Sequence, residues 1–458
     1  MRKSIGSWLQ SEFLRSDFVR SVGVLAGGTA ASQLIGVLAL PFITRLYTPG
    51  DFSVLAVYVS VVTILSVPAC LRLDFAIPLP EDDSDAFSLL AASLIMSMLS
   101  ALAVGVGVYL LTDLLGSYIT NKGILKYLWL VPIGVWTMSS YSALQYWMGR
   151  KKAFRSIAQG RAVQMSSSVG VQFLLAGTFL KEMGLLLGYL ANSLVGCVYL
   201  GSCLAGEIRR HARFVSISSA MVVISKFKAF PKYSTWESLA NSAAIELPMV
   251  IIATVTVGPE AGYLMLASRV MAMPMGLIGS SVAQVFLSNA PTEMRQNRLS
   301  EFTRRTLVGL GKAGVGPLIF VGIVAPGIFG HVFGASWEKA GVLIAWMTPW
   351  FVLQFLVSPV STSFHVLGRV RLAMLIQVFG LVLRLGMIFV AHYFVPAYVA
   401  ESYALSGAIF YFVYFSVSCS ICKVSQLELW KNLFFKSPII LAWGLLGGLG
   451  LIVSRLLW

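Results

Sequence analysis

The chain has few charged residues for its length. Only 12% of its 458 residues are Asp, Glu, Lys or Arg, whereas 57% are hydrophobic, and the mean hydropathy is +0.81. Soluble domains carry about 25% charged residues. A water-soluble chain of this composition would lack the polar groups that cover a surface. The composition instead predicts a protein whose solvent is lipid, with its backbone hydrogen bonds closed inside helices.

Cysteine and histidine are also scarce, with five and four residues respectively. Cys419 and Cys422 have the CxxC spacing, but they end a hydrophobic run that has no βαβ context, so a redox or metal role is not favoured. The histidines are scattered, and we predict no metal site. The GxGxxG match at 309–314 opens a membrane helix and follows no strand, and no Walker motif occurs. No catalytic triad or carboxylate pair can be argued, so we predict a protein that is not an enzyme and has no cofactor.

Long hydrophobic segments occupy almost the whole chain. A helix needs about 20 apolar residues to cross a bilayer, and thirteen segments meet this requirement. They are 22–44, 52–73, 86–112, 125–148, 157–180, 184–205, 234–257, 260–289, 306–329, 340–363, 372–395, 398–422 and 437–457. We therefore predict an all-α polytopic membrane protein. Two GxxxG pairs, Gly184 with Gly188 and Gly444 with Gly448, predict close helix packing.

Basic residues exceed acidic ones, with 34 Lys and Arg against 19 Asp and Glu and a net charge of +15. They lie between apolar runs and form no nucleic-acid motif, so we expect no nucleic acid and favour membrane lipids or an anionic substrate as partners. With the N-terminus in the cytoplasm, 26 of the 34 fall on the cytoplasmic side. This asymmetry predicts a cytoplasmic N-terminus, and thirteen spans then place the C-terminus outside.

The two halves of the chain look related. Leu40-Pro41 closes the first span and Leu247-Pro248 lies late in the seventh, while Gly149-Arg150 and Gly368-Arg369 follow the fourth and tenth. The offsets, 207 and 219 residues, differ only by loop length. We predict two six-helix bundles in a pseudo-two-fold arrangement around a central cavity, plus an extra C-terminal helix. The predicted domains are a cytoplasmic segment 1–21, a bundle 22–205, a basic amphipathic segment 206–232, a bundle 233–422, and a linker with a further helix 423–458.

Charged residues inside the spans are the main functional candidates, because a charge within a membrane usually faces a cavity or a partner. Arg269, Arg384 and Glu246 lie mid-span. Glu246 and Arg269 reach similar depth across a hairpin. They either pin that hairpin, or Arg269 and Arg384 form a cationic site that Glu246 partly neutralises.

Further polar residues complete the set of candidates. Arg161 and Arg45 join Arg269 and Arg384 as candidates for binding an anionic head group. Candidates for ion coupling or gating are Glu246, Glu237, Asp74 and Asn241, and the expected helix breaks are Pro41 and Pro248. Broken helices at matching places in two repeats indicate a substrate path.

Four short motifs occur in a fixed order along the chain. They are Arg45-Leu-Tyr-Thr-Pro-Gly-Asp-Phe52, Leu71-Arg-Leu-Asp74 with Ala76-Ile77, Gln145 with Arg150 and Phe154, and Phe333-Gly-Ala-Ser-Trp337 with Ala340. On these motifs the chain resembles the Wzx-type oligosaccharide and O-antigen flippases of the multidrug/oligosaccharidyl-lipid/polysaccharide exporter superfamily. Ser53 stands where that family usually has Gly, and Asp74 where it more often has Glu.

The resemblance implies a flippase of the bacterial inner membrane. Its substrate would be undecaprenyl-diphosphate-linked oligosaccharide, moved to the periplasmic leaflet by alternating access for O-antigen, capsule or exopolysaccharide assembly. Implied partners are this lipid-linked oligosaccharide, membrane lipids, and the polymerase and chain-length machinery. Two alternatives stay open: a cation-coupled drug antiporter of the same superfamily, and a membrane polysaccharide polymerase or ligase. Short external loops disfavour the second.

Overall fold

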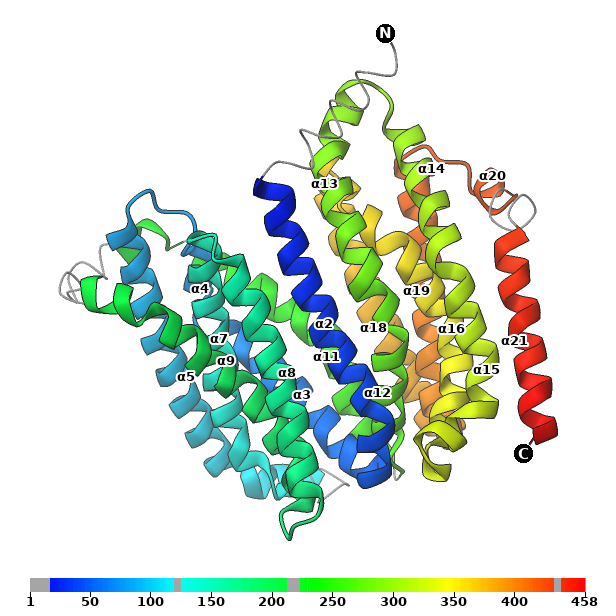
Figure 1. The fold of residues 1–458 in the computed structure, drawn as a ribbon, viewed down its shortest axis with the longest axis horizontal. Coiled ribbons are helices and arrows are strands. Elements are labelled where there is room, and N and C mark those ends of the chain that lie inside the picture. The colour runs from blue at the N-terminus through cyan, green and yellow to red at the C-terminus, as the bar shows by residue number, and fades with distance from the viewer. Residues whose placement is uncertain are drawn as a thin grey trace. The chain divides into compact units, whose positions relative to one another are not determined.

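The computed structural model describes residues 17–118, 125–211, 223–228, 230–256, 258–431 and 438–457. Every regular element within these ranges is a helix (Figure 1). The predicted all-α class is therefore confirmed. Residues 1–16, 119–124, 212–222, 229, 257, 432–437 and 458 lie outside the described residues, and they include parts of the predicted segments 1–21, 206–232 and 423–458.

The first six predicted spans are all helical. The turn between the first two is closed by a capping box, in which Thr48 N donates to Asp51 Oδ2 at 2.8 Å and Asp51 N donates to Thr48 Oγ1 at 3.3 Å. Pro49 suits the first helical position because its missing N–H would be unpaired there. The helices are α2 (Asp17–Leu46), α3 (Pro49–Ala69), α4 (Leu73–Ala76), α5 (Asp83–Tyr118), α7 (Val131–Arg150), α8 (Phe154–Ala176) and α9 (Lys181–His211).

The second half begins with α11 and continues to the last predicted span. Two of its spans contain π-helical turns, η4 (Met275–Gly279) between α12 and α13 and η5 (Gly311–Val315) between α14 and α15. The α-helices are α11 (Thr235–Val255), α12 (Glu260–Met271), α13 (Ser280–Arg295), α14 (Leu299–Leu310), α15 (Gly316–Phe333), α16 (Glu338–Val360), α17 (Ser363–Val366), α18 (Val370–Phe394), α19 (Val399–Ile421), α20 (Gln426–Trp430) and α21 (Pro438–Leu457).

Nine helices in the described part of the chain are long and apolar enough to cross a membrane. The other four predicted spans are also helical, in α7, α8, α12–α13 and α21, but they fall below this standard. In α8 the polar residues Gln164, Ser168 and Gln172 lower the hydropathy, and all three are buried within the protein. The protein is a multi-pass membrane protein.

The helices form two compact units. We call the part made of Met1–Ala39 and Tyr58–Glu246 the N-terminal unit, and the part made of Leu40–Val57 and Leu247–Trp458 the C-terminal unit. The chain passes between units inside α2, α3 and α11, and the crossings in α2 and α11 lie directly before Pro41 and Pro248. A proline inside a helix removes a backbone hydrogen bond and weakens the helix at that point. The domain boundaries expected from the sequence stay a prediction.

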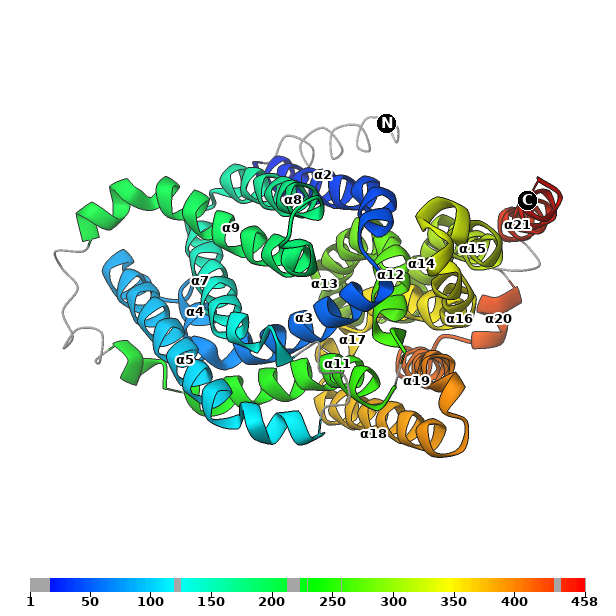
Figure 2. The ribbon, with the colours of Figure 1, turned by 90° about the horizontal axis from the view of Figure 1, so that it is seen from below.

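Helix packing within the units supports the internal repeat. In the N-terminal unit α7 packs on α5 and α9, and α8 packs on α9. In the C-terminal unit α16 packs on α15 and α19, and α18 packs on α19 (Figure 2). The turns before α8 and α18 also match, because each contains a left-handed residue, Lys152 with φ 54° and Gly368 with φ 67°.

Glycines test the expected close packing. A Cβ on Gly188 would lie 2.9 Å from the backbone oxygen of Ser168, so α8 and α9 approach closely at this point. The prediction for Gly444 and Gly448 is wrong within the described part of the chain, where nothing lies within 4 Å of a Cβ on either glycine. Gly447 faces Ile323 of α15 instead, since a helix presents one face to its neighbour and these glycines lie off it.

Candidate functional site

Asp74 lies in a sharp turn after α3. Leu71 and Arg72 have φ of 50° and 57°, a left-handed conformation that lets α4 begin at Leu73. The Asp74 side chain is only 4% exposed. Ser142 Oγ, from α7, donates to Asp74 Oδ2 at 2.9 Å, while Oδ1 is buried without a hydrogen-bond partner among the described residues. This carboxyl group is therefore only half satisfied.

The electrostatic surroundings of Asp74 favour its neutral form. Burial raises the pKa of the carboxyl group above its ordinary value. The hydrogen bond from Ser142 and the charge of Arg72 lower the pKa by smaller amounts. Desolvation dominates because an ionised carboxylate loses more hydration than these neighbours return. Asp74 thus accepts a proton more readily than an exposed aspartate does.

Arg72 is held beside Asp74 by aromatic contact. Its Cζ lies 4.9 Å from the centroid of the Phe75 ring, and its Nε is buried without a hydrogen-bond partner among the described residues. Phe75 in turn meets the Tyr146 ring edge-on, with centroids 5.6 Å apart. The second motif of the resemblance therefore packs against the helix that carries the third.

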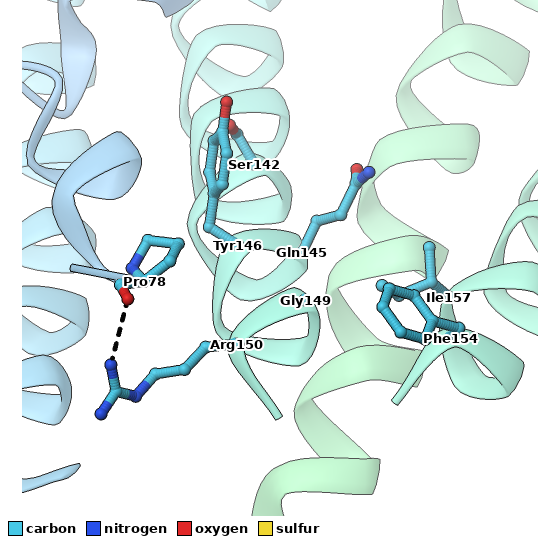
Figure 3. A pocket seen from close by; sticks show the side chains of 8 residues that line it. All are labelled: Pro78, Ser142, Gln145, Tyr146, Gly149, Arg150, Phe154 and Ile157. Carbon is cyan, nitrogen blue, oxygen red and sulfur yellow. Dashed lines mark hydrogen bonds between the residues drawn. The ribbon is translucent and has the colours of Figure 1, made fainter. Parts of the chain in front are cut away.

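A cavity of about 460 Å³ adjoins this cluster (Figure 3). We call it the α7 cavity, because most of its polar lining comes from α7. Ser142 reaches both this cavity and Asp74, so the buried carboxyl group lies directly behind the wall. The lining residues are Pro78, Ser142, Gln145, Tyr146, Gly149, Arg150, Phe154 and Ile157.

Arg150 forms one wall of the cavity but is fully occupied. Its side chain clamps the loop before α5 to the end of α7. Nε donates to Asp83 Oδ1 at 3.1 Å, and Nη2 lies 3.0 Å from the same oxygen. Nη1 donates to the Pro78 and Pro80 oxygens at 3.3 and 2.5 Å, and Nη2 to the Glu81 oxygen at 3.0 Å. These contacts account for all five N–H donors of the guanidinium.

Arg384 in the C-terminal unit is 8% exposed and lies in an aromatic cage. Its Cζ lies 4.6 Å from the ring centroid of Phe410, 5.7 Å from that of Trp350 and 5.9 Å from that of Tyr411. Its Nε is buried and has no hydrogen-bond partner among the described residues. Ring faces attract a cation, and the Tyr411 hydroxyl is hydrogen-bonded to the guanidinium, but Nε stays unused as a donor.

The first and fourth motifs of the resemblance meet inside the C-terminal unit. Trp337 Nε1 donates to the Thr44 oxygen at 2.9 Å, and its ring meets Phe52 edge-on at 4.8 Å. Arg45 Nη2 donates to the His331 oxygen at 3.0 Å. Arg45 is exposed and ties the end of α2 to α15. Its predicted head-group role stays a prediction.

The remaining predicted arginines lie in different surroundings. Arg161, in α8, donates to Thr29 Oγ1 of α2 within the N-terminal unit. Arg269 lies in the last turn of α12 with an exposed side chain. Arg269 and Arg384 thus differ strongly in burial, and their joint role stays a prediction.

Among the predicted coupling residues, Glu246 has a clear partner. Ser60 Oγ, from α3, donates to Glu246 Oε2 at 2.7 Å within the N-terminal unit. Glu237 and Asn241, also on α11, are exposed. Glu246 and Arg269 belong to different units, so their expected ion pair stays a prediction.

Sequence reasoning did not single out Ser142, Tyr146 or the aromatic cage. Ser142, Gln145, Tyr146 and Gly149 follow i, i+3, i+4, i+7 spacing, which places them on one helix face. That spacing could have indicated the polar wall. The rings of the cage come from α16 and α19 and surround Arg384 on α18, and no sequence pattern within one helix predicts this arrangement. Among the described residues, no group of three His, Cys, Asp or Glu side chains could hold a metal ion.

Known proteins share this sequence family and this fold. A family model described as "Polysaccharide biosynthesis protein" matches residues 42–341. The chain is similar to the solved structure "Lipid II flippase MurJ, inward closed conformation", with TM-score 0.71, 14% identity, and coverage of 94% of this chain and 97% of that chain. A search of curated protein sequences finds no match.

Two further solved structures share the fold. One is an inward-facing "multidrug resistance MATE family transporter of the MOP superfamily", with TM-score 0.56, 13% identity, and coverage of 89% and 95% of the two chains. The other is a "MOP superfamily transporter from Pyrococcus furiosus", with TM-score 0.52, 12% identity, and coverage of 90% and 97%. The chain therefore belongs to the polysaccharide biosynthesis protein family and has the fold of the flippases and transporters of the MOP superfamily.

Proposed function

We propose that the protein moves undecaprenyl-diphosphate-linked oligosaccharide from the cytoplasmic to the periplasmic leaflet of a bacterial inner membrane. The observation that carries this proposal is Arg384. None of the ion pairs among the described residues includes it, and its Nε has no hydrogen-bond partner there. A cation without a counter-ion in a membrane helix favours an anionic substrate, and a guanidinium suits phosphate oxygens.

The family and the fold support the choice of substrate class. The matching family is named for polysaccharide biosynthesis, and the similar structure with TM-score 0.71 is called a lipid II flippase. A lipid-linked saccharide carries its charge in the head group, while its tail can stay in the bilayer. The polysaccharide polymerase and chain-length machinery would then act on the transported product.

Two weakened helices suit alternating access. α2 and α11 each pass from one unit to the other directly before a proline, Pro41 or Pro248. Hinges are positions where a helix absorbs backbone change at low cost. We propose that these two prolines let the units move as bodies. Asp74, whose raised pKa eases protonation, is the candidate carrier if protons drive the cycle.

Deletion of the gene in the source cell tests the proposal. We expect loss of surface polysaccharide and accumulation of lipid-linked oligosaccharide on the cytoplasmic side. Both changes should reverse when the full chain is restored. Normal polysaccharide without accumulated intermediate would contradict the proposal.

A second candidate is a cation-coupled drug antiporter, which the likeness to MATE transporters favours. Such an antiporter needs carboxylates that exchange a proton or sodium ion for the drug, and Glu246 and Asp74 are half-buried and buried carboxylates. Under this alternative, the deletion strain would become sensitive to lipophilic cations while its surface polysaccharide stays normal. The same strain therefore separates the two functions.

A further inference from the structure

The α7 cavity is formed by the N-terminal unit alone, whereas the aromatic cage of Arg384 belongs to the C-terminal unit. Its volume of about 460 Å³ falls in the usual range for small-molecule sites, roughly 300–1,000 Å³. Its lining also has the usual character, with apolar and aromatic walls and a few polar groups. The cavity therefore has the size and composition of a ligand site.

The charges around the cavity offer no free partner to a charged ligand. Every N–H of Arg150 already has an acceptor, either Asp83 at the start of α5 or a carbonyl oxygen in the loop before it, so the guanidinium has no free donor for an anion. Behind Ser142, the Asp74 carboxyl group would repel an anion when ionised. Arg72 lies close enough to Asp74 for its charge to lower the pKa of that carboxyl group, so these two charges oppose each other. Arg150 is the one charged residue among those that line the cavity, and it is already paired, so the lining favours a neutral ligand.

The groups that remain available are a neutral amide and aromatic rings. The Gln145 amide has no hydrogen-bond partner among the described residues, and it points into the open space in Figure 3. An amide offers two donors and one acceptor, which match the hydroxyl groups of a sugar. The rings of Tyr146 and Phe154 supply apolar faces beside it. Gly149 leaves the wall open, because a Cβ there would lie more than 4 Å from every described neighbour outside the helix backbone.

We infer that the α7 cavity binds a neutral sugar residue, with Gln145 bonding its hydroxyl groups and the rings of Tyr146 and Phe154 lying against its carbon face. The inference rests on the proposed function and deepens it, because it assigns part of the saccharide specificity to the N-terminal unit. Arg384 would bind the charged diphosphate, whereas the α7 cavity would bind a neutral sugar of the head group. The two sites therefore recognise different chemistry.

The test measures binding of the sugar portion alone. The probe is the repeat-unit oligosaccharide obtained by partial hydrolysis of the surface polysaccharide of the source cell, which carries neither diphosphate nor lipid. Purified full-length protein in lipid nanodiscs is titrated with this probe, and binding is followed by saturation-transfer NMR. Inorganic pyrophosphate is titrated separately as the anionic probe. We expect the oligosaccharide to bind and pyrophosphate to leave its binding unchanged.

Two matched glycines provide the variant and its control. Gly149→Leu fills the cavity, whereas Gly201→Leu on α9 adds the same side chain at another open helical position of the same unit. We expect Gly149→Leu to abolish oligosaccharide binding and Gly201→Leu to retain it, with both thermal transitions close to that of the wild type. Gln145→Ala should weaken binding about tenfold, the cost of losing a pair of neutral hydrogen bonds. Gln159→Ala, outside the cavity, should not weaken it.

Three outcomes would overturn the inference: no binding to the wild-type protein, equal binding to Gly149→Leu, or displacement of the oligosaccharide by pyrophosphate. The last result would identify the cavity as an anion site. A different experiment tests the flippase proposal: a deletion strain that keeps its surface polysaccharide would contradict it. A protein that fails this binding test while the deletion strain accumulates intermediate would keep its function and lose only the sugar site.

Discussion

Arg384 carries a full positive charge where water has almost no access. Three aromatic rings surround it, and each such contact contributes about 2 kcal/mol when desolvated. The cage can therefore hold the cation in the unit without a carboxylate partner. That arrangement preserves the charge for an incoming anion, which a salt bridge would not do.

Replacing Arg384 separates packing from charge. Arg384→Met keeps most of the side-chain volume and removes the cation, so we expect loss of surface polysaccharide at an unchanged protein level. Arg384→Lys should restore part of the export, because it returns the charge without the planar fork. Arg155→Met, at an exposed position on α8, is the control and should export normally. Normal export by Arg384→Met would remove Arg384 from the substrate path.

Asp74 predicts a measurable pH dependence of stability. Its folded pKa is raised by burial, so between the ordinary value of about 3.9 and this higher value the folded state binds more protons than the unfolded state. Stability from this group therefore falls as pH rises through that window. Asp74→Asn cannot ionise, yet its amide oxygen can still accept the Ser142 hydrogen bond.

We therefore expect the Tm of Asp74→Asn, relative to wild type, to increase as pH rises above about 4. Thermal unfolding of both purified proteins in matched detergent at several pH values measures this difference. Other groups cancel in the comparison because the two chains share them. Parallel Tm curves would show that Asp74 has the same pKa in both states.

At the scale of helices, local composition predicts the spans and leaves their packing undecided. All thirteen predicted segments are helical, but α5 continues to Tyr118 and α9 to His211, beyond their apolar runs. Helices extend past hydrophobic segments because each added residue closes another backbone hydrogen bond. The GxxxG pairs show the limit more sharply, since the same spacing packs closely at Gly188 and stays open at Gly444.

The two glycines make a matched test of helix packing. Gly188→Leu forces new atoms against Ser168 and Gln172 of α8, so we expect a loss of about 1–3 kcal/mol of stability from overpacking. Gly444→Leu meets open space and should leave the Tm nearly unchanged. Thermal unfolding of each variant provides the comparison. Equal Tm shifts would show that α8 and α9 are not held in close contact at Gly188.

At the scale of the whole molecule, the chain divides within helices and not at a linker. α2 contributes to both units, so the hairpin turn 45–52 packs in the C-terminal unit through Trp337. Hydropathy could not show this exchange, because it reports exposure to lipid and says nothing of which apolar partner a helix selects. The repeated positions of Pro41 and Pro248 were visible in the sequence, and the units divide beside both.

Orientation in the membrane is open to a direct test. The excess of basic residues on one side predicts a cytoplasmic N-terminus and, with thirteen spans, an external C-terminus. A reporter enzyme that is active only outside the cytoplasm should be active when fused after residue 458. Fused after Lys152, in the turn between α7 and α8, it should be inactive. The opposite pattern would reverse the topology.

The sequence by itself determined the solvent, the secondary structure and the repeat of this protein. These properties follow from composition and from spacing within a few turns of helix, and both are local. Only the tertiary structure decided which charges are buried and with whom. Asp74 meets Ser142 across 68 residues and Trp337 meets Thr44 across 293, while the cage of Arg384 joins three helices. Such contacts depend on which faces of distant helices meet. The pattern of apolar residues along one helix predicts which face is buried, but it does not identify the helix that packs against that face.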